Sequence, residues 1–424
     1  MTSDSLGEEL RREVGGGALS ELSDGPPGWR VEPLDGEALA GVVRVLNERR
    51  GTARVRGSGT HDALGNRVDE PALLLSTQAL CGIEELDTQD GVVRVRAGTP
   101  LGELRTRVAP HGWELPLGAP DSATVGGTIG AAAIDARRLG YGAPRDCVLG
   151  LDVVLATAER TRCGGRVVKN VTGFDLAKLY TGSLGSLCVI EAAWLRLRPR
   201  PQTVAVRIAR LGVDPGDGRE GIGSGRARAD RALEAARRTT ARCAALVDAG
   251  FAADLGLGTA SSGAPYLLVE FAGSEPGVAN DLHWLEASFD VAEAPPEAID
   301  RLSALQRGEP EHGARARVAV LPSRCAQVLE GLQSTGARVV AHPGLGLVYA
   351  EWSASAVALE MLGPLVDRTR GEARFEWLPA AQKRGLDVFG IGSDARARVD
   401  RMRALKQQFD PARVLNPGRG LGRV

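Results

Sequence analysis

Three glycine-rich turns are the segments of this sequence whose residue types could do chemistry. They are Arg56-Gly57-Ser58-Gly59-Thr60, residues 120–130 and residues 181–186. Glycine leaves backbone N–H groups uncovered, and successive uncovered N–H groups bind anions. One such turn is usually only a tight turn, but three within residues 31–201 favour a ligand that carries a pyrophosphate. Hydroxyl groups that would add donors are those of Ser58, Thr60, Thr124 and Thr128.

The two commonest nucleotide-binding motifs with glycine loops do not fit these turns. A Walker loop needs Gly-Lys followed by Ser or Thr, and no lysine in the sequence follows a glycine. A Rossmann fingerprint needs a third glycine three residues after the second, but Gly59 is followed by Thr60, His61 and Asp62. Both nucleotide folds are therefore disfavoured.

The cysteines do not support a metal centre. All six lie far apart and none forms a Cys-x-x-Cys pair, so neither zinc nor an iron–sulfur cluster is predicted. They are Cys81, Cys147, Cys163, Cys188, Cys243 and Cys325.

Length and charge set the class of protein. The 424 residues are enough for two or three domains, and 52 basic against 53 acidic side chains give a net charge of -1, which argues against a nucleic-acid partner. No apolar run is long enough for a transmembrane segment, and residues 1–17 have no apolar signal core. The expected location is cytoplasmic.

The first glycine turn must be positioned by the elements before it. Leu39, Val42, Val43 and Leu46 fall on one helical face, and Ala53–Arg56 is a short strand that leads into Gly57. Further strands are expected at residues 92–96, 148–156 and 187–197, with a helical stripe of Leu101, Leu104 and Val108 between them. Residues 31–201 are thus predicted to form one mixed α/β domain.

The rest of the chain predicts an α+β domain and a docked end. Residues 1–30 are an N-terminal extension, residues 202–393 the second domain with a flexible loop at 211–230, and residues 394–424 a helix and docking segment. In the second domain strands are expected at 266–271, 315–321 and 345–352, and helices at 278–288, 324–333 and 356–368.

Together these segments resemble the FAD-binding (PCMH-type) domain of the vanillyl-alcohol oxidase superfamily. The resemblance is carried by the three glycine turns, by Tyr141-Gly142 with Arg145-Asp146, and by residues 169–176. Within that superfamily the sequence most resembles the FAD-binding E subunit of bacterial glycolate oxidase, which also ends in Phe-Asp-Pro and Leu-Asn-Pro-Gly, here residues 409–418. It implies an α+β fold: a domain of two α/β subdomains, a smaller α+β cap domain with an antiparallel sheet, and a C-terminal segment that returns to the FAD domain.

The resemblance also implies which residues bind FAD. The first two loops would hold the pyrophosphate, Arg56 and Arg145 could balance its charge or be solvated, and Lys169 with Asn170 would lie near the flavin ring and stabilise its reduced form. The implied cofactor-binding residues are Arg56, Gly57, Ser58, Gly59, Thr60, His61, Pro120, Asp121, Thr124, Val125, Gly126, Gly127, Thr128, Gly130, Tyr141, Gly142, Arg145, Asp146, Lys169, Asn170, Gly185 and Val189.

The FAD is expected to be bound non-covalently. Many superfamily members tether it to a histidine that directly follows the first glycine loop, and here Thr60 takes that place. His61 comes one residue later, where a histidine with a purely structural hydrogen bond fits equally well.

Residues 342–349 are either a degenerate form of a metal site of related 2-hydroxyacid dehydrogenases or a strand pair broken by glycines that resembles it by chance. The motif of those dehydrogenases, His-x-Gly-Asp-Gly-Asn-x-His, corresponds to residues 342–349, where Leu345, Leu347 and Tyr349 replace polar residues. One imidazole, His342, cannot hold a catalytic divalent ion, so no metal is predicted. The Glu311-His312-Gly313 segment is read as a surface loop, and the sequence identifies no catalytic base.

The predicted function is that of an FAD-binding subunit of a glycolate oxidase-like 2-hydroxyacid dehydrogenase complex. Electrons would pass from substrate through flavin to a partner, and the resemblance implies a second flavin subunit and an iron–sulfur subunit. The complex could lie at the inner membrane through those partners. The alternatives are a self-sufficient FAD-dependent oxidase or dehydrogenase of another alcohol, and a structural FAD-binding paralogue.

Overall fold

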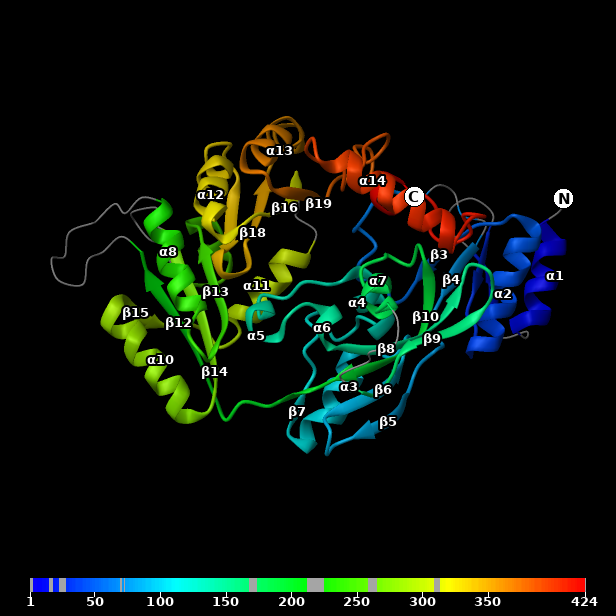
Figure 1. Cartoon of the computed structure of the whole chain (residues 1–424), viewed down its shortest axis with the longest axis horizontal. Helices are drawn as coiled ribbons and strands as arrows, with labels where there is room; N and C mark the ends of the chain where they lie inside the picture. The colour runs from blue at the N-terminus through cyan, green and yellow to red at the C-terminus, as the bar shows by residue number, and fades with distance from the viewer. Residues whose placement is uncertain are drawn as a thin grey trace.

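The structure is a computed structural model that describes residues 3–14, 18–22, 28–68, 71, 73–167, 174–211, 225–257, 265–308 and 313–423. Figure 1 shows an N-terminal domain, coloured blue to green, beside a cap domain coloured green to orange. The last helix, in red, returns from the cap to the N-terminal domain. In the described ranges, no helix is both long enough and apolar enough to cross a bilayer.

The first subdomain is a four-stranded sheet covered by two helices. Its strand order is β1-β2-β4-β3, with β1 antiparallel to β2 and the other pairs parallel. Asp35 caps α2 by accepting from the N–H of Ala38, and the predicted helical stripe is buried. The predicted N-terminal extension contains α1 and β1, so it is an integral part of this layer. The elements are α1 (Ser3–Val14), β1 (Leu19–Glu21), β2 (Trp29–Val31), α2 (Gly36–Arg49), β3 (Ala53–Arg56) and β4 (Leu73–Ser76).

The second subdomain is built on a five-stranded antiparallel sheet, β5-β6-β10-β8-β9. Val93, Val95 and Leu151 alternate onto the face that α3, α4 and α7 cover. A two-stranded ribbon, β7 with β11, closes its lower end. The elements are β5 (Ile83–Asp87), β6 (Val92–Arg96), α3 (Leu101–Val108), β7 (Trp113–Glu114), α4 (Val125–Ala131), α5 (Arg138–Tyr141), α6 (Pro144–Cys147), β8 (Val148–Leu155), β9 (Arg160–Gly164), α7 (Leu176–Tyr180), β10 (Cys188–Arg196) and β11 (Arg198–Pro199).

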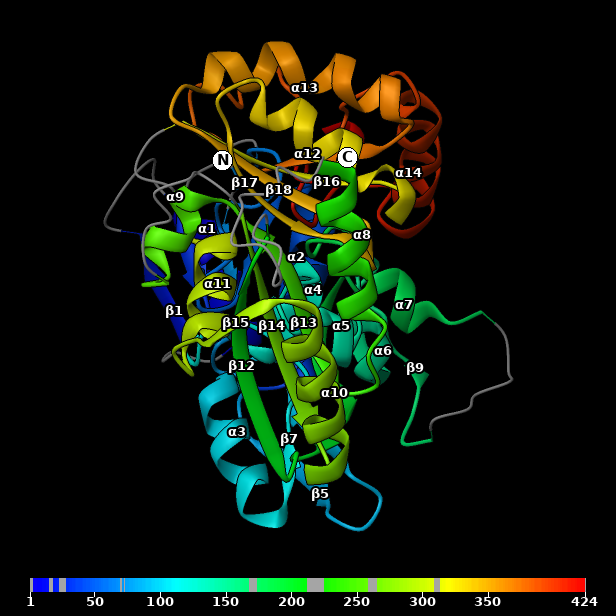
Figure 2. The same ribbon diagram turned by 90° about the vertical axis from the view of Figure 1, so that its left-hand side faces the viewer.

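The cap domain is an eight-stranded antiparallel sheet in the order β15-β12-β14-β13-β17-β18-β16-β19. Helices α8, α10, α12 and α13 pack on one face, and α9 with α11 pack on the other. Figure 2 shows α8 and α10 in front of β12, β13 and β14. The elements are β12 (Thr203–Arg210), α8 (Gly225–Ala236), β13 (Ala241–Val247), α9 (Ala249–Asp254), β14 (Tyr266–Gly273), α10 (Glu275–Ser288), β15 (Asp290–Glu293), α11 (Ala298–Arg307), β16 (Ala314–Ala319), α12 (Cys325–Gln333), β17 (Arg338–His342), β18 (Leu347–Trp352), α13 (Ser355–Thr369) and β19 (Glu372–Trp377).

The predicted α+β class is confirmed, but the loop expected at residues 211–230 ends earlier than predicted. The strands and helices expected in the cap match observed elements apart from their ends. Helix α8 starts at Gly225, inside the segment 211–230 that was expected to be a flexible loop. Residues 212–224 of that segment lie outside the described residues.

The C-terminal segment docks on the first sheet, as its sequence predicted. Helix α14 (Ala395–Phe409) carries Lys406, whose buried ammonium donates to Asp410 (2.6 Å) and to the carbonyl of Ser186 (2.7 Å). Beyond it, Leu415 forms a parallel bridge with Ala53, the first residue of β3. This segment therefore pairs with β3, the edge strand that leads into the first glycine turn.

Buried ion pairs fix the cap against the N-terminal domain. Arg137, between α4 and α5, donates to Glu270 of β14 at 2.9 and 3.0 Å and also pairs with Asp300 of α11. Arg242 of β13 lies 2.8 Å from the carboxylate of Glu114. Because Glu270 is almost fully buried, removing Arg137 would leave a costly unpaired charge in the domain interface.

Candidate functional site

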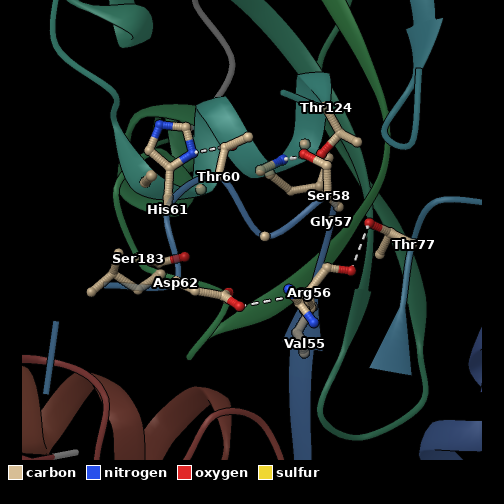
Figure 3. Close-up of a pocket in the computed structure, with 18 of the residues that line it drawn as sticks. Val55, Arg56, Gly57, Ser58, Thr60, His61, Asp62, Thr77, Thr124 and Ser183 are labelled. Carbon is tan, nitrogen blue, oxygen red and sulfur yellow. Dashed lines mark hydrogen bonds and ion pairs between the residues drawn. The ribbon is translucent and has the colours of Figure 1, made fainter. Parts of the chain in front are cut away.

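A cleft with about 650 Å³ of empty space opens where both subdomains meet the C-terminal segment. Figure 3 shows its walls, in which the turn after β3 faces the start of α4. All three predicted glycine turns contribute to it. The lining residues are Val55, Arg56, Gly57, Ser58, Gly59, Thr60, His61, Asp62, Thr77, Thr124, Gly126, Gly127, Gly130, Ala131, Ser183, Leu184, Gly185, Cys188, Ile190 and Arg419.

The turn after β3 requires glycine for two different reasons. A Cβ at Gly57 would overlap the Thr124 hydroxyl, so the two loops could not approach as they do. Gly59 has φ of +88°, which strongly disfavours a residue with a side chain. These two glycines let the backbone of residues 57–60 form one wall of the cleft.

Of the hydroxyl groups that were expected to add donors, those of Thr124 and Thr128 make hydrogen bonds within the protein, whereas that of Ser58 makes none with the residues that the structure describes. Thr124 Oγ1 accepts from the N–H of Gly127 at 3.2 Å, and Thr128 donates to the carbonyl of Thr124. Ser58 Oγ is buried and has no hydrogen-bond partner within the described chain. A buried donor without a partner in a polar cleft is what a bound phosphate or ribose would satisfy.

Arg419 is a cleft residue that the sequence reasoning missed. It is only 7% exposed and donates to the carbonyl of His61 at 3.1 Å. Burial, with Arg54 and Arg56 nearby and Asp62 opposing them, lowers its pKa to about 10. Keeping this guanidinium charged while it is buried costs free energy, and an anionic ligand in the cleft would offset that cost. The signal in the sequence was an arginine directly after the predicted docking motif Asn416-Pro417-Gly418.

Asn416 places that arginine in the cleft. Its side-chain carbonyl accepts from the N–H of Val55 at 2.9 Å, and its amide donates to the carbonyl of Leu184 at 2.7 Å. One buried side chain thus ties the first glycine turn, the third glycine turn and the C-terminal segment together.

Arg56 lines the cleft, with its charge partly balanced in the protein. Its Nε lies 2.9 Å from Asp62, a carboxylate that Arg54 also contacts at 3.0 Å. With Arg419, the cleft has more cationic than anionic side chains, which fits the pyrophosphate of FAD.

Several residues expected to bind FAD lie outside the lining of this cleft, so their role stays a prediction. Asp121 is exposed and pairs with Arg105, and Tyr141 accepts from Arg242 of the cap at 3.2 Å. Val125, Thr128 and Val189 are buried in the cores, whereas Cys188 and Ile190, beside Val189, reach the cleft. Those outside the lining are Pro120, Asp121, Val125, Thr128, Tyr141, Gly142, Arg145, Asp146 and Val189. Lys169 and Asn170 lie outside the described residues, so their role stays a prediction.

A second pocket, with about 470 Å³ of empty space, adjoins the cleft and lies between the two domains. Thr60, His61 and Ala131 line both spaces. The lining residues are Thr60, His61, Ala63, Leu64, Ala131, Ala133, Ile134, Gln306, Arg307, Tyr349, Arg374 and Glu376. The sequence reasoning had assigned no role to the cap side of this pocket.

Register in the cap sheet brings its polar wall together. Tyr349 of β18 lies opposite Arg317 of β16, which lies opposite Arg374 of β19. Their neighbours Val318 and Val348 point to the core on the other face. Alternation of Arg with Ala or Val in residues 314–319 was the sequence signal for a strand with one polar face.

The charges of this wall leave a cationic excess. Glu376 accepts from Arg374 at 2.8 and 3.3 Å and lies 3.2 Å from Arg317. Burial opposes ionisation of Glu376, but the two guanidinium groups outweigh it and lower its pKa. Arg307 donates to the carbonyls of Gly118 and Ile134, so its position is fixed by the N-terminal domain.

Four buried polar atoms of the second pocket have no hydrogen-bond partner among the residues that the structure describes. They are His61 Nε2, Gln306 Oε1, Arg307 Nε and Tyr349 OH. Tyr349 is 2% exposed, and burial raises the pKa of its phenol to about 12, so it is a neutral donor. Unpaired buried polar atoms are rare in folded proteins, so four around one pocket indicate a polar ligand.

The degenerate metal motif has become part of the domain contact. Leu347 packs with Ile134 and Tyr349, with Leu345 beside them. His342 is buried with its Nε2 2.7 Å from Gln306 Nε2, and burial lowers its pKa to about 4. Across the described ranges, no group of three or more His, Cys, Asp or Glu side chains could hold a metal ion. Glu311 and His312, expected in a surface loop, are outside those ranges.

Comparison with known proteins agrees with this geometry. Residues 27–164 match the family described as "FAD binding domain". The chain is 35% identical over 178 residues to a D-lactate dehydrogenase of Archaeoglobus fulgidus, covering 42% of this chain and 40% of that protein. It is 33% identical over 151 residues to the glycolate oxidase subunit GlcE of Escherichia coli, covering 35% and 43%. These matches span less than half of each relative.

A solved structure extends the likeness to the whole fold. The 4-ethylphenol oxidase of Gulosibacter chungangensis superposes with a TM-score of 0.72 at 14% sequence identity, over 99% of this chain and 97% of that one. The cap domain, where the sequence resemblance was weak, is therefore shared as a fold. The chain therefore contains an FAD-binding domain at residues 27–164, with FAD as its cofactor, and as a whole it shares the fold of this oxidase.

Proposed function

We propose that this protein is an FAD-dependent oxidoreductase subunit that oxidises a small 2-hydroxyacid and passes the electrons to a partner subunit. The observation that carries the proposal is the second pocket, which adjoins the FAD cleft and has four unpaired polar atoms in its lining. Bound FAD supplies a hydride acceptor. The groups that would hold it are the glycine turns, Ser58 and Arg419.

The charge of the pocket supports a carboxylate substrate. Arg307 and Arg374 line it against one carboxylate, Glu376, which already has two arginine partners. An anionic group beside Arg307 Nε would satisfy that unpaired donor. The relative from Archaeoglobus fulgidus is named for D-lactate, a small 2-hydroxyacid, which agrees with this chemistry.

The partner is supported by the likeness to a glycolate oxidase subunit. We therefore expect the chain to belong to a complex with a second flavin subunit and an iron–sulfur subunit. The second pocket favours substrate oxidation at the flavin of this chain over oxidation only at the second flavin subunit.

Anaerobic mixing of the purified holoprotein with glycolate, D-lactate and D-2-hydroxyglutarate tests the proposal. We expect one of these acids to remove the visible absorbance of oxidised flavin, with little steady-state turnover until the partner subunits are added. Absence of flavin reduction by all three acids, with and without partners, would overturn the 2-hydroxyacid assignment. Rapid turnover by the isolated chain with a dye would instead support the self-sufficient enzyme.

A pair of variants on α11 connects the pocket to the substrate. Arg307→Met removes the guanidinium that lines the pocket, whereas Arg301→Met changes an exposed residue of the same helix. A hydrogen bond to a charged group is worth about 1.5–3 kcal/mol, so Arg307→Met should weaken acid binding about 10- to 100-fold. The Arg301→Met protein should bind the acid normally. Equal binding by both variants would place the substrate elsewhere.

A further inference from the structure

We infer that His61 is the proton acceptor for the hydroxyl group that is oxidised, an inference that rests on the proposed function. His61 is the first titratable residue after the glycine turn and lines both the FAD cleft and the second pocket. In Figure 3 its ring lies beyond Thr60, on the opposite side from Arg56 and Thr77. A base at the junction of the two spaces can contact the atom that loses a proton while the neighbouring carbon faces the flavin.

The hydrogen bonds of the imidazole leave one nitrogen for substrate. His61 Nδ1 lies 3.0 Å from Thr60 Oγ1, whereas Nε2 is buried and has no partner in the part of the chain described. In the tautomer with hydrogen on Nδ1, the ring donates to Thr60 and keeps a lone pair on Nε2. Thr60 thus positions the base. It occupies the place at which many members of the vanillyl-alcohol oxidase superfamily carry the histidine that tethers FAD.

Charged groups on every side keep His61 neutral before substrate binds. Arg307 faces it from α11, Arg419 from the C-terminal segment and Glu376 from β19, and Asp62 follows it in its own turn. Burial and the two guanidinium groups outweigh the two carboxylates and lower the pKa of His61 to about 4. A neutral imidazole can accept a proton, whereas an imidazolium cannot.

Substrate itself would make this base stronger. A carboxylate placed against Arg307 neutralises part of the positive charge that opposes protonation of His61. The pKa of His61 therefore rises on binding, towards the pH at which proton transfer is effective. The same arginine would bind substrate and tune the base.

Oxidation of the substrate breaks an O–H bond and a C–H bond. The O–H bond of the 2-hydroxyacid breaks and its proton goes to His61 Nε2, while the C2–H bond breaks and its hydrogen leaves with both electrons as hydride. Bound FAD would supply the two-electron oxidant that accepts this hydride. The C–O single bond becomes the C=O bond of a 2-oxo acid, and the imidazolium then releases its proton to solvent.

Two variants of His61 and one control test this role by rate. His61→Asn and His61→Gln should retain FAD and still bind oxalate, which is judged by perturbation of the flavin spectrum. Flavin reduction by the 2-hydroxyacid should slow by about 100- to 10,000-fold, the usual contribution of a general base. His283→Asn, at an exposed position on α10, should reduce as the wild type does. The wild-type rate should fall at acidic pH as His61 is protonated, and the residual rate of the variants should lose that dependence.

A spectroscopic readout does not depend on catalysis. The chain has 5 histidines, so the His61 signal in ¹⁵N-histidine-labelled holoprotein is identified as the one missing from His61→Asn. We expect a neutral ring with its hydrogen on Nδ1 at neutral pH, and a change in its signal when oxalate is added. A charged ring, or hydrogen on Nε2, would overturn the assignment of His61.

The outcomes separate this inference from the proposed function. Wild-type flavin that is reduced by a 2-hydroxyacid, together with equally fast reduction in both His61 variants, overturns only the role of His61. Wild-type flavin that no 2-hydroxyacid reduces overturns the proposed function and the proton acceptor with it.

Discussion

Replacing Arg419 by Met should have opposite effects on the apoprotein and on cofactor binding. Burial lowers the pKa of Arg419 from the ordinary range of an arginine to about 10. One pKa step corresponds to about 1.4 kcal/mol between charged and neutral forms, so holding this cation costs the folded apoprotein about 3 kcal/mol. The variant also loses the hydrogen bond from Arg419 to the carbonyl of His61, which reduces the gain in stability by about 1 kcal/mol. Arg419→Met should therefore raise the free energy of unfolding of the apoprotein by about 2 kcal/mol.

The same variant should bind FAD more weakly. Loss of one charge-assisted hydrogen bond to the cofactor, worth about 1.5–3 kcal/mol, corresponds to a Kd about 10- to 100-fold higher. Urea unfolding of the apoprotein and fluorescence titration with FAD measure the two effects. Arg413→Met is the matched control, because Arg413 is an exposed arginine of the same segment. If Arg419→Met lowered the free energy of unfolding of the apoprotein, or left the Kd for FAD unchanged, the idea that this cation is retained for an anionic ligand would be refuted.

Three other changes probe how the cofactor is held. Heat or acid should release FAD from the precipitated chain because Thr60 occupies the expected tether position; flavin that stays on the protein would contradict the non-covalent assignment. Gly127→Val should abolish FAD retention, since a Cβ added at this position would lie 2.8 Å from Thr124 Oγ1 and the rest of the side chain would extend into the cleft. Normal FAD occupancy of this variant, measured by absorbance, would show that the phosphate site lies elsewhere. Asn416→Ala should lower the free energy of unfolding by about 2–6 kcal/mol, because two buried backbone groups lose their hydrogen-bond partners at about 1–3 kcal/mol each. Asn416→Gly is the control for backbone strain, because Asn416 has a φ of +43° and glycine adopts that conformation without strain. A change of less than about 1 kcal/mol in urea unfolding would show that the docking segment is held by other contacts.

The sequence alone determined the features that depend on neighbouring residues. The strand Ala53–Arg56 and the strand at residues 92–96 were predicted with their observed bounds, because period-two alternation is a local property. The need for Gly59 is also local, because it is set by the backbone conformation of that residue, whereas the need for Gly57 comes from the close approach of Thr124 in the folded chain. The glycine turns were among the residues that predicted the FAD-binding domain, which the match at residues 27–164 supports.

Only the tertiary structure decided which of the predicted residues meet and which others join them. Val189 was expected at the cofactor, but a strand turns successive side chains to opposite faces, so Cys188 and Ile190 line the cleft instead. Arg419 reaches the cleft because Asn416 ties the end of the chain to Val55, a contact between residues 361 positions apart.

The second pocket was beyond sequence reasoning for the same physical reason. Tyr349 was placed in a predicted strand and in the motif of a lost metal site, whereas no element was predicted at Arg374 and Glu376. Nothing in the local sequence sets the register that aligns the three residues. His61 and Arg307 come from opposite sides of the domain interface. Local sequence determined the glycine turns that line the first cleft, whereas strand register and domain packing created the pocket beside it, because those contacts join residues that no local pattern connects.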